Sequence, residues 1–201
     1  MRAMIAAFVL GALGACQPEI GYETYLCGLE ADCPDGQLCN GPDNRCVAAA
    51  SALPFACDPM VEHEPDNTPA QAFAFPDPTC VSGPIDQRGC LADGDAEDWL
   101  KFAVPADCTA VVAHLHMSYP ISYEEVPFEL AAADGTVLEQ AGDCGPTETS
   151  LAAFGVIDRC LKRTVTPGQS YLVHVKADLT SSCDGNCAFN RYALTLQLET
   201  P

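Results

Sequence analysis

The chain has 201 residues, and nine Lys and Arg residues against 28 Asp and Glu residues give it a formal net charge of −19. A surface this acidic repels phosphate backbones, so we expect no nucleic-acid partner, although it attracts divalent cations loosely. The length suits one ordinary domain with a small appendage.

The N-terminus has the pattern of a secretory signal peptide. Arg2 precedes an apolar run from Met4 to Ala12, and small residues lead to Cys16. The tetrapeptide 13–16 resembles the lipobox of bacterial lipoproteins, which implies that Cys16 carries a thioether-linked diacylglycerol after cleavage. By the sorting rule of enteric bacteria, Gln17 then implies an outer-membrane lipoprotein of the cell envelope that faces the exterior or the periplasm. An ordinary signal peptide with a chance cysteine is the alternative.

The cysteine count agrees with a lipidated Cys16. The chain has 13 cysteines, and removing Cys16 leaves an even number that can all pair. So many cysteines are typical of an oxidising compartment, and the absence of a C-x2-C pair argues against zinc binding. The expected disulfide cysteines are Cys27, Cys33, Cys39, Cys46, Cys57, Cys80, Cys90, Cys108, Cys144, Cys160, Cys183 and Cys187.

Residues 27–46 contain four cysteines spaced C-x5-C-x5-C-x6-C, with turn-forming residues between them. A segment this short buries no useful core, so we expect its bridges to hold it. It resembles the short EGF-like or Dickkopf-like repeats of bacterial surface lipoproteins. That resemblance implies pairing of Cys27 with Cys39 and of Cys33 with Cys46, although four cysteines permit other connectivities. We expect a spacer here in preference to a binding module.

Strand periodicity dominates the remainder of the chain. Five prolines between Val61 and Asp86 predict extended, irregular coverage of another element. Apolar and polar residues then alternate with period two, and Asp134-Gly135 predicts a hairpin. The predicted strands are 98–104, 109–117, 128–132, 137–138, 171–176 and 191–199. Residues 139–160 are ambiguous, and 147–154 fit either a strand or one helical turn. The pattern indicates an all-β, antiparallel sandwich with one buried face per sheet.

Five landmarks follow one another in this region. They are EPDNTPAQA (64–72), GDAEDWLKFAV (94–104), FELAAADGTVLEQ (128–140), VTPGQSYLVHV (165–175) and YALTLQL (192–198). In this order they resemble the bacterial pre-peptidase C-terminal domain, which implies a jelly-roll-like β-sandwich that binds, targets or stabilises without catalysis. We therefore divide the chain into a signal peptide (1–15), a tether (16–26), a cysteine-rich knot (27–46), a linker (47–61) and the sandwich domain (62–200).

The chain departs from this family in carrying eight cysteines around the sandwich. They suggest stapled loops, with Cys183 bonded to Cys187 and Cys144 bonded to Cys160. Eight cysteines allow too many connectivities for the sequence to decide the others.

The acidic loop 93–98 precedes the first regular strand. It lacks the glycine and glutamate of an EF-hand, but alternating carboxylates can supply the oxygens that calcium prefers. Collagen-binding relatives of the family bind calcium between the opening acidic segment and the sheet. By position, this implies calcium ligands at Glu64, Asp66 and Asn67 with Asp95 or Asp98. A solvated turn without a metal is the alternative.

Three histidines and three aromatic residues are further site candidates. His114 and His116 share the outward face of their strand and His174 also points outward, so zinc or copper is a second metal hypothesis beside ordinary surface residues. Around the loop after residue 119, we expect a ligand platform or a cover for the end of the sandwich. The residues of this aromatic platform are Tyr119, Tyr123 and Phe128.

No known nucleophile or metalloprotease motif occurs, and the adjacent Glu124 and Glu125 point to opposite faces of a strand, so we expect no enzyme. The sequence predicts a lipid-anchored, cell-surface binding or adhesion module for protein or polysaccharide. An accessory subunit that docks an exported enzyme is the alternative, and a hydrolase with an unrecognised site is a third hypothesis.

Overall fold

The computed structural model describes residues 33–40, 45–52, 57, 63–92, 95–120, 125–145, 156–177 and 190–201. Cys16, Cys27, Cys183, Cys187 and Tyr123 lie outside these ranges, as do the signal peptide and residues 147–154. Within them the chain forms strands and one short 3-10 helix, η1 (Ala49–Ser51). No described helix has the length and apolarity needed to cross a membrane.

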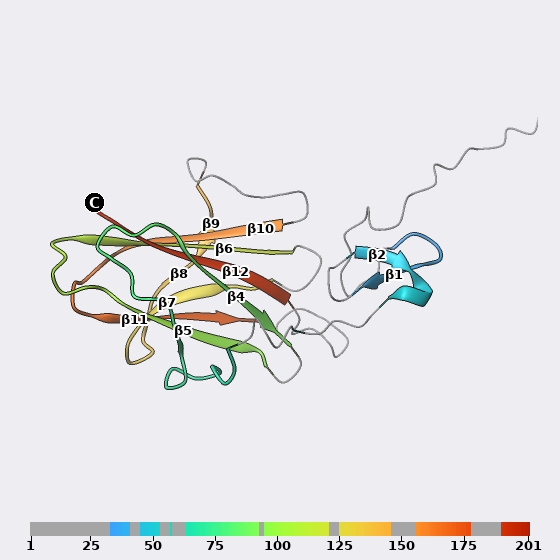
Figure 1. Cartoon of the computed structure of the whole chain (residues 1–201), viewed down its shortest axis with the longest axis horizontal. Coiled ribbons are helices and arrows are strands. Elements are labelled where there is room, and N and C mark those ends of the chain that lie inside the picture. Colours follow the sequence, from blue (N-terminus) through green and yellow to red (C-terminus); the bar gives the residue numbers. More distant parts are fainter. Residues whose placement is uncertain are drawn as a thin grey trace, which may run out of the picture.

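Two five-stranded sheets pack face to face (Figure 1). The β6 sheet has the order β4 (Ile85–Leu91), β12 (Asn190–Glu199), β6 (Val111–Pro120), β10 (Val156–Val165) and β9 (Gly142–Asp143). The β11 sheet has the order β3 (Phe73–Ala74), β5 (Glu97–Ala103), β11 (Ser170–Lys176), β7 (Phe128–Ala132) and β8 (Val137–Gln140). Described neighbours are antiparallel except β3 and β5. The predicted all-β sandwich is confirmed.

The core follows directly from period-two patterning. On β6, Val111, Ala113, Leu115 and Met117 are fully buried, and the residues between them face outward. Residues of β12 alternate in the same way, and on β11 the inward residues are Tyr171, Val173 and Val175, so the inner faces of both sheets supply one continuous apolar cluster. Burial of these side chains is the main favourable contribution to folding, at roughly 1.5–3 kcal/mol for each large one.

Two strands differ from the sequence prediction. Residues 85–86 belonged to the segment expected to be irregular and no strand was predicted over 87–91, but residues 85–91 form β4, because Pro84 precedes the strand and the missing N–H of proline costs nothing there. In the ambiguous region 139–160, the chain forms the end of β8, then β9, then the first half of β10. Both strands lie at or beside a sheet edge, where period-two alternation is weakest.

The cysteine-rich knot contains a separate two-stranded sheet, β1 (Gln37–Asn40) with β2 (Arg45–Ala48). Cys33 is bonded to Cys46, which is the pairing that the EGF-like or Dickkopf-like resemblance implies. The expected partner of Cys39 lies outside the described residues.

Among the described residues, three further disulfides staple the sandwich domain. They join Cys57 to Cys90, Cys80 to Cys108, and Cys144 to Cys160, and the third matches the pairing suggested by the sequence. The bonds close loops with sequence separations of 33, 28 and 16 residues. Loops of this size typically gain about 3 kcal/mol from a bridge, through restriction of the unfolded chain.

The proposed aromatic platform is wrong for the two residues that the structure describes. Tyr119 and Phe128 are each 1% exposed and belong to the apolar cluster between the sheets. Both lie on the inward alternation of their strands, so they close the end of the core and present no surface to a ligand.

Phe128→Ala should therefore lower the free energy of unfolding by about 3–5 kcal/mol, because it leaves a cavity in the core. Val137→Ala on the adjacent strand β8 is the matched control. Val137 is 46% exposed, so its truncation should change stability by less than about 0.5 kcal/mol. Urea unfolding without reductant measures both variants, and equal effects would contradict the assignment of Phe128 to the core.

Candidate metal centre

Carboxylates converge where the opening segment of the sandwich domain meets the start of β5. Oxygen atoms of Glu64, Asp95 and Asp98 all lie within 4.8 Å of one another. The backbone N–H of Trp99 donates to the carbonyl of Asp66 at 2.9 Å, which ties the opening segment to β5. Two segments about thirty residues apart in sequence therefore supply one acidic cluster.

The opening segment fixes its own glutamate. The Glu64 carboxylate accepts hydrogen bonds from the backbone N–H of Asp66 and from the side-chain amide of Asn67, both at 3.1 Å. Asp66 is only 5% exposed and lines the same cavity as Glu64, Asp95 and Asp98. That cavity has a volume of about 10 Å³, close to the space needed by one water molecule or ion.

The expected calcium residues are thus mostly assembled. Glu64, Asp66, Asp95 and Asp98 share one cavity, and Asn67 contacts it through its hydrogen bond to Glu64. Asp93 of the acidic loop lies outside the described residues.

Asp98 is the most constrained member of the cluster. It points inward from β5 and is 4% exposed. Burial raises the pKa of this carboxyl from 3.8 to about 8; the Tyr192 hydroxyl, donating to Oδ2 at 2.5 Å, opposes the rise, and repulsion from Asp66, Asp95 and Glu64 adds to it. A divalent cation would replace this repulsion with attraction, so the cluster has the electrostatic character of a cation site.

Tyr192 and Gly89 complete the site and were not identified from the sequence. Burial beside Asp98 raises the pKa of the Tyr192 hydroxyl well above its usual value, so the group remains a hydrogen-bond donor. Gly89 faces Tyr192 across the β4–β12 pair. A Cβ at Gly89 would lie 2.2 Å from the Tyr192 hydroxyl oxygen, so only glycine leaves room for this ring. A glycine inside a strand is the sequence signal for such a close approach.

The donor chemistry fits a hard cation. Calcium takes six to eight oxygen ligands, and carboxylates are its preferred protein donors. Glu64, Asp95 and Asp98 would hold the ion directly, with the buried Asp66 beside them. Such an ion would supply positive charge between the opening segment and β5, and would fasten the two together.

The histidines do not form a common metal site. His114 and His116 lie on the outer face of the β6 sheet, whereas His174 lies on β11 in the opposite sheet. His174 is on the outer face as expected, but it is 7% exposed because the Trp99 ring stacks on it at 3.9 Å. Its two ring nitrogens face Glu129 at 2.9 Å and Glu97 at 3.2 Å. A site made from all three imidazoles is therefore excluded.

Comparison with known proteins gives similarity to solved structures but no sequence match. The chain matches no known family model, and no curated protein sequence is similar to it. Among solved structures, the pre-peptidase C-terminal domain of collagenase from Bacillus anthracis is similar, with a TM-score of 0.41 and 14% sequence identity. The match covers 69% of this chain and 100% of that domain. It is a domain of the type that the five sequence landmarks resemble.

The raised pKa of Asp98 predicts how the chelator-treated protein depends on pH. Asp98 binds a proton up to about pH 8 when folded, but ionises near pH 3.8 when unfolded. The stability that Asp98 gains by holding its proton in the folded state is therefore complete below pH 3.8. As the pH rises toward 8 this stability is lost, and the free energy of unfolding falls by roughly 1.4 kcal/mol per pH unit. Urea unfolding between pH 5 and 8 should show this decline in the wild type.

Asp98→Asn keeps a neutral side chain at every pH and should remove the decline, whereas the exposed control Asp77→Asn should keep it. A decline of equal slope in Asp98→Asn and the wild type would contradict the assignment of the raised pKa to this carboxyl.

Proposed function

We propose that this chain is a lipid-anchored, calcium-stabilised binding module of the bacterial cell surface, which recognises protein or polysaccharide and performs no catalysis. The observation that carries the proposal is the difference between the outer faces of the two sheets. One outer face is covered by the chain itself, whereas the described residues leave the other open.

The opening segment crosses the outer face of the β11 sheet. The carbonyl of Asp66 accepts a hydrogen bond from the backbone N–H of Trp99 on β5. Farther along, the Pro69 ring lies 3.7 Å from the point where a Cβ would stand on Gly135, at the β7–β8 turn. Between these points, Ala72 packs with Trp99 and Leu172 in a second small apolar cluster. In Figure 1 this segment runs along the outside of the lower sheet.

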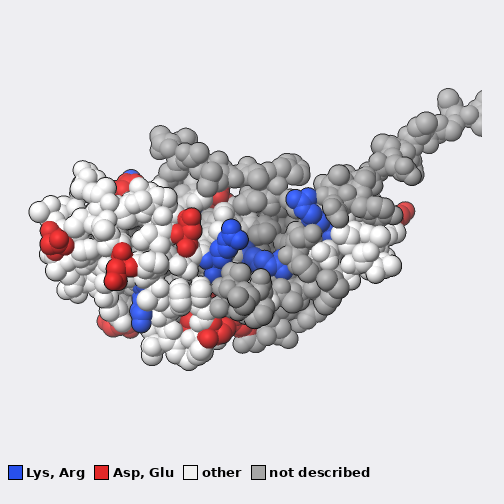
Figure 2. Space-filling view, in the orientation of Figure 1, with Lys and Arg blue, Asp and Glu red and all other residues white. Residues whose placement is uncertain are grey.

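The outer face of the β6 sheet carries polar and small side chains. From β4 to β10 these include Arg88, Thr195, Gln197, His114, His116, Ser118 and Lys162. An outer face that presents hydrogen-bond donors and acceptors suits an extended peptide or a glycan. The space-filling view shows Asp and Glu over one end of the sandwich and Lys and Arg gathered nearer the middle of the molecule, so charge varies along it (Figure 2).

The acidic cavity supports such a surface indirectly. A cation held by Glu64, Asp95 and Asp98 would lock the covering segment onto β5. Together with the disulfides, it would give a rigid platform, which lowers the entropic cost of ligand binding. Cys16 would attach this platform to the membrane through its lipid, with the knot as spacer.

Calorimetric titration of the chelator-treated protein should give heat for one calcium ion per chain. Below pH 8, binding should also release protons, because Asp98 is protonated in the free protein; heats in buffers of different ionisation enthalpy measure this release. At a hundredfold excess over Kd, calcium should stabilise the fold by about 2.7 kcal/mol. Glu64→Gln and Asp98→Asn should weaken binding at least tenfold, whereas Asp77→Asn should not. Absence of both heat and stabilisation would rule out the calcium site.

Recognition is tested by crosslinking the lipidated protein on intact cells and by binding to glycan arrays and immobilised collagen. Binding should fall at least tenfold in Ser118→Arg, which places a bulky charge on the open face, but not in the control Val137→Arg on the other sheet. Recovery of one stoichiometric protein partner would favour the alternative, an accessory subunit that docks an exported enzyme. Equal binding by both variants would contradict recognition by the β6 sheet.

A further inference from the structure

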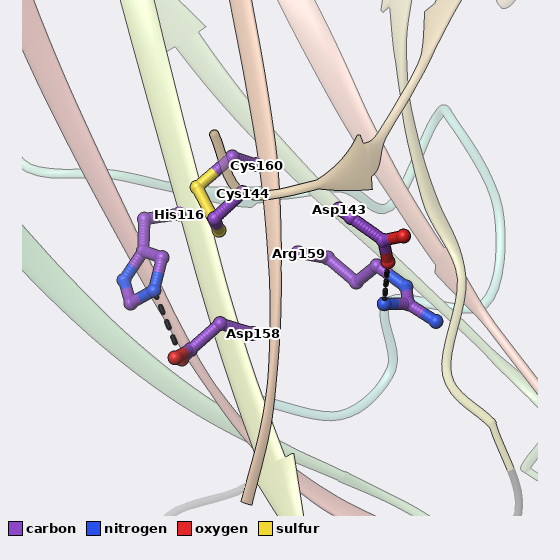
Figure 3. The surroundings of a disulfide bond; sticks show 6 residues. All are labelled: His116, Asp143, Cys144, Asp158, Arg159 and Cys160. Carbon is purple, nitrogen blue, oxygen red and sulfur yellow. Dashed lines mark hydrogen bonds and ion pairs between the residues drawn. A yellow bond between two sulfur atoms is a disulfide. The ribbon is translucent and has the colours of Figure 1, made fainter. Parts of the chain in front are cut away.

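A second group of metal-ligating side chains lies at the opposite edge of the β6 sheet from β4. Its members are His116 on β6, Cys160 on β10, and Cys144, which follows β9. One ligand atom from each lies within 4.8 Å of the others. Figure 3 shows the disulfide, His116 and Asp158 together on one side of β10, with Arg159 and Asp143 on the other side.

Strand register produces this grouping. His116 is directly opposite Cys160 in the β6–β10 pair, so the two side chains share the outer face. Asp158 is two residues before Cys160 on the same face, and its Oδ1 lies 3.0 Å from His116 Nε2. β9 pairs with β10 at Cys160, which brings Cys144 to the same place.

In the structure the two sulfur atoms are bonded to each other, so neither is a thiolate able to bind a metal. A cellular dithiol would change this. It transfers two electrons and two protons to the disulfide, becomes a cyclic disulfide itself, and leaves Cys144 and Cys160 as thiols.

We propose that reduction of the Cys144–Cys160 bond creates a zinc site. Both thiols lose a proton on binding Zn²⁺, so each ion bound releases two protons. His116 supplies the third ligand and Asp158 the fourth. With Zn–S near 2.3 Å and Zn–N or Zn–O near 2.0 Å, neighbouring ligand atoms in a tetrahedron are about 3.3–3.8 Å apart. Ligand atoms of His116, Cys144 and Cys160 already lie within 4.8 Å of one another, and the two sulfurs separate once their bond is broken. The Asp158 carboxylate, whose Oδ1 lies 3.0 Å from His116 Nε2, would turn toward the ion.

The proposed zinc site is accessible to solvent, and its disulfide has a histidine beside it. The His116 side chain is 19% exposed and Cys144 is half-buried, so a reductant and a metal ion can approach from the outer face. Cys80 and Cys108 also have a carboxylate close to their sulfurs, that of Asp107, but their cluster contains no imidazole. Zinc at Cys144 and Cys160 would continue to hold β9 against β10 after the disulfide is lost.

Cobalt is the probe, because thiolate ligation of Co²⁺ gives an intense charge-transfer absorption. The full chain is treated with increasing dithiol, the reductant is removed without oxygen, and free thiols are counted. We expect the band only after reduction, at one Co²⁺ per chain, with displacement by Zn²⁺. Cys144→Ser combined with Cys160→Ser should abolish the band, whereas the matched pair Cys80→Ser with Cys108→Ser should keep it.

His116→Ala should weaken Co²⁺ binding at least tenfold, and His114→Ala, on the same face two residues away, should leave it unchanged. Circular dichroism of every variant verifies that the β-sandwich persists. The proposal is overturned if the band survives in the Cys144–Cys160 serine variant, if the two histidine variants bind equally, or if the reduced chain binds cobalt only after losing its β-structure.

Discussion

The hydrogen bond from Tyr192 to Asp98 joins the two sheets at the end of the sandwich where the chain enters it. Asp98 belongs to β5 and Tyr192 to β12, so this one contact crosses the core. It is also the point at which a buried carboxyl meets three other acidic side chains. Gly89 is required for it, because any side chain there would displace the tyrosine ring. Core packing and the proposed cation site therefore share the same few atoms.

The path of the chain as it enters the sandwich domain also determines which outer sheet face the described residues leave uncovered. Between its hydrogen bond to Trp99 at Asp66 and its pairing with β5 at β3, the chain passes over the outer face of the β11 sheet as far as the β7–β8 turn. That crossing buries Trp99 and Leu172, which would otherwise be exposed apolar residues on an outer face. Trp99 in turn stacks on His174, whose imidazole lies between two carboxylates. The β6 sheet has no comparable cover among the described residues, and this asymmetry is the basis of the proposed recognition face.

Local patterning predicted most of the sandwich, because alternation within a strand is determined by which face is buried. The same logic failed for edge elements such as β4, whose sequence IDQRGCL alternates weakly. It also placed Tyr119 and Phe128 in a ligand platform, because adjacency to a loop was given more weight than their inward alternation. The acidic site was identified through a family resemblance, yet the contributions of Tyr192 and Gly89 depend on a β4–β12 pairing that spans about a hundred residues.

Cysteine can form disulfides or bind metal ions, and the choice between these roles depends on strand pairing that the sequence does not reveal. Zinc binding by the cysteines was rejected from the sequence because no C-x2-C pair exists, a criterion that suits ligands carried on one short loop. In a sheet, ligands converge through register instead: His116 meets Asp158 across 42 residues, and Cys144 meets Cys160 across 16. A disulfide and a metal site with two thiolate ligands both need two sulfurs on one face of the sheet. The strand geometry that favours the disulfide therefore also suits the proposed zinc site. What distinguishes this bridge is the imidazole that strand pairing places beside it.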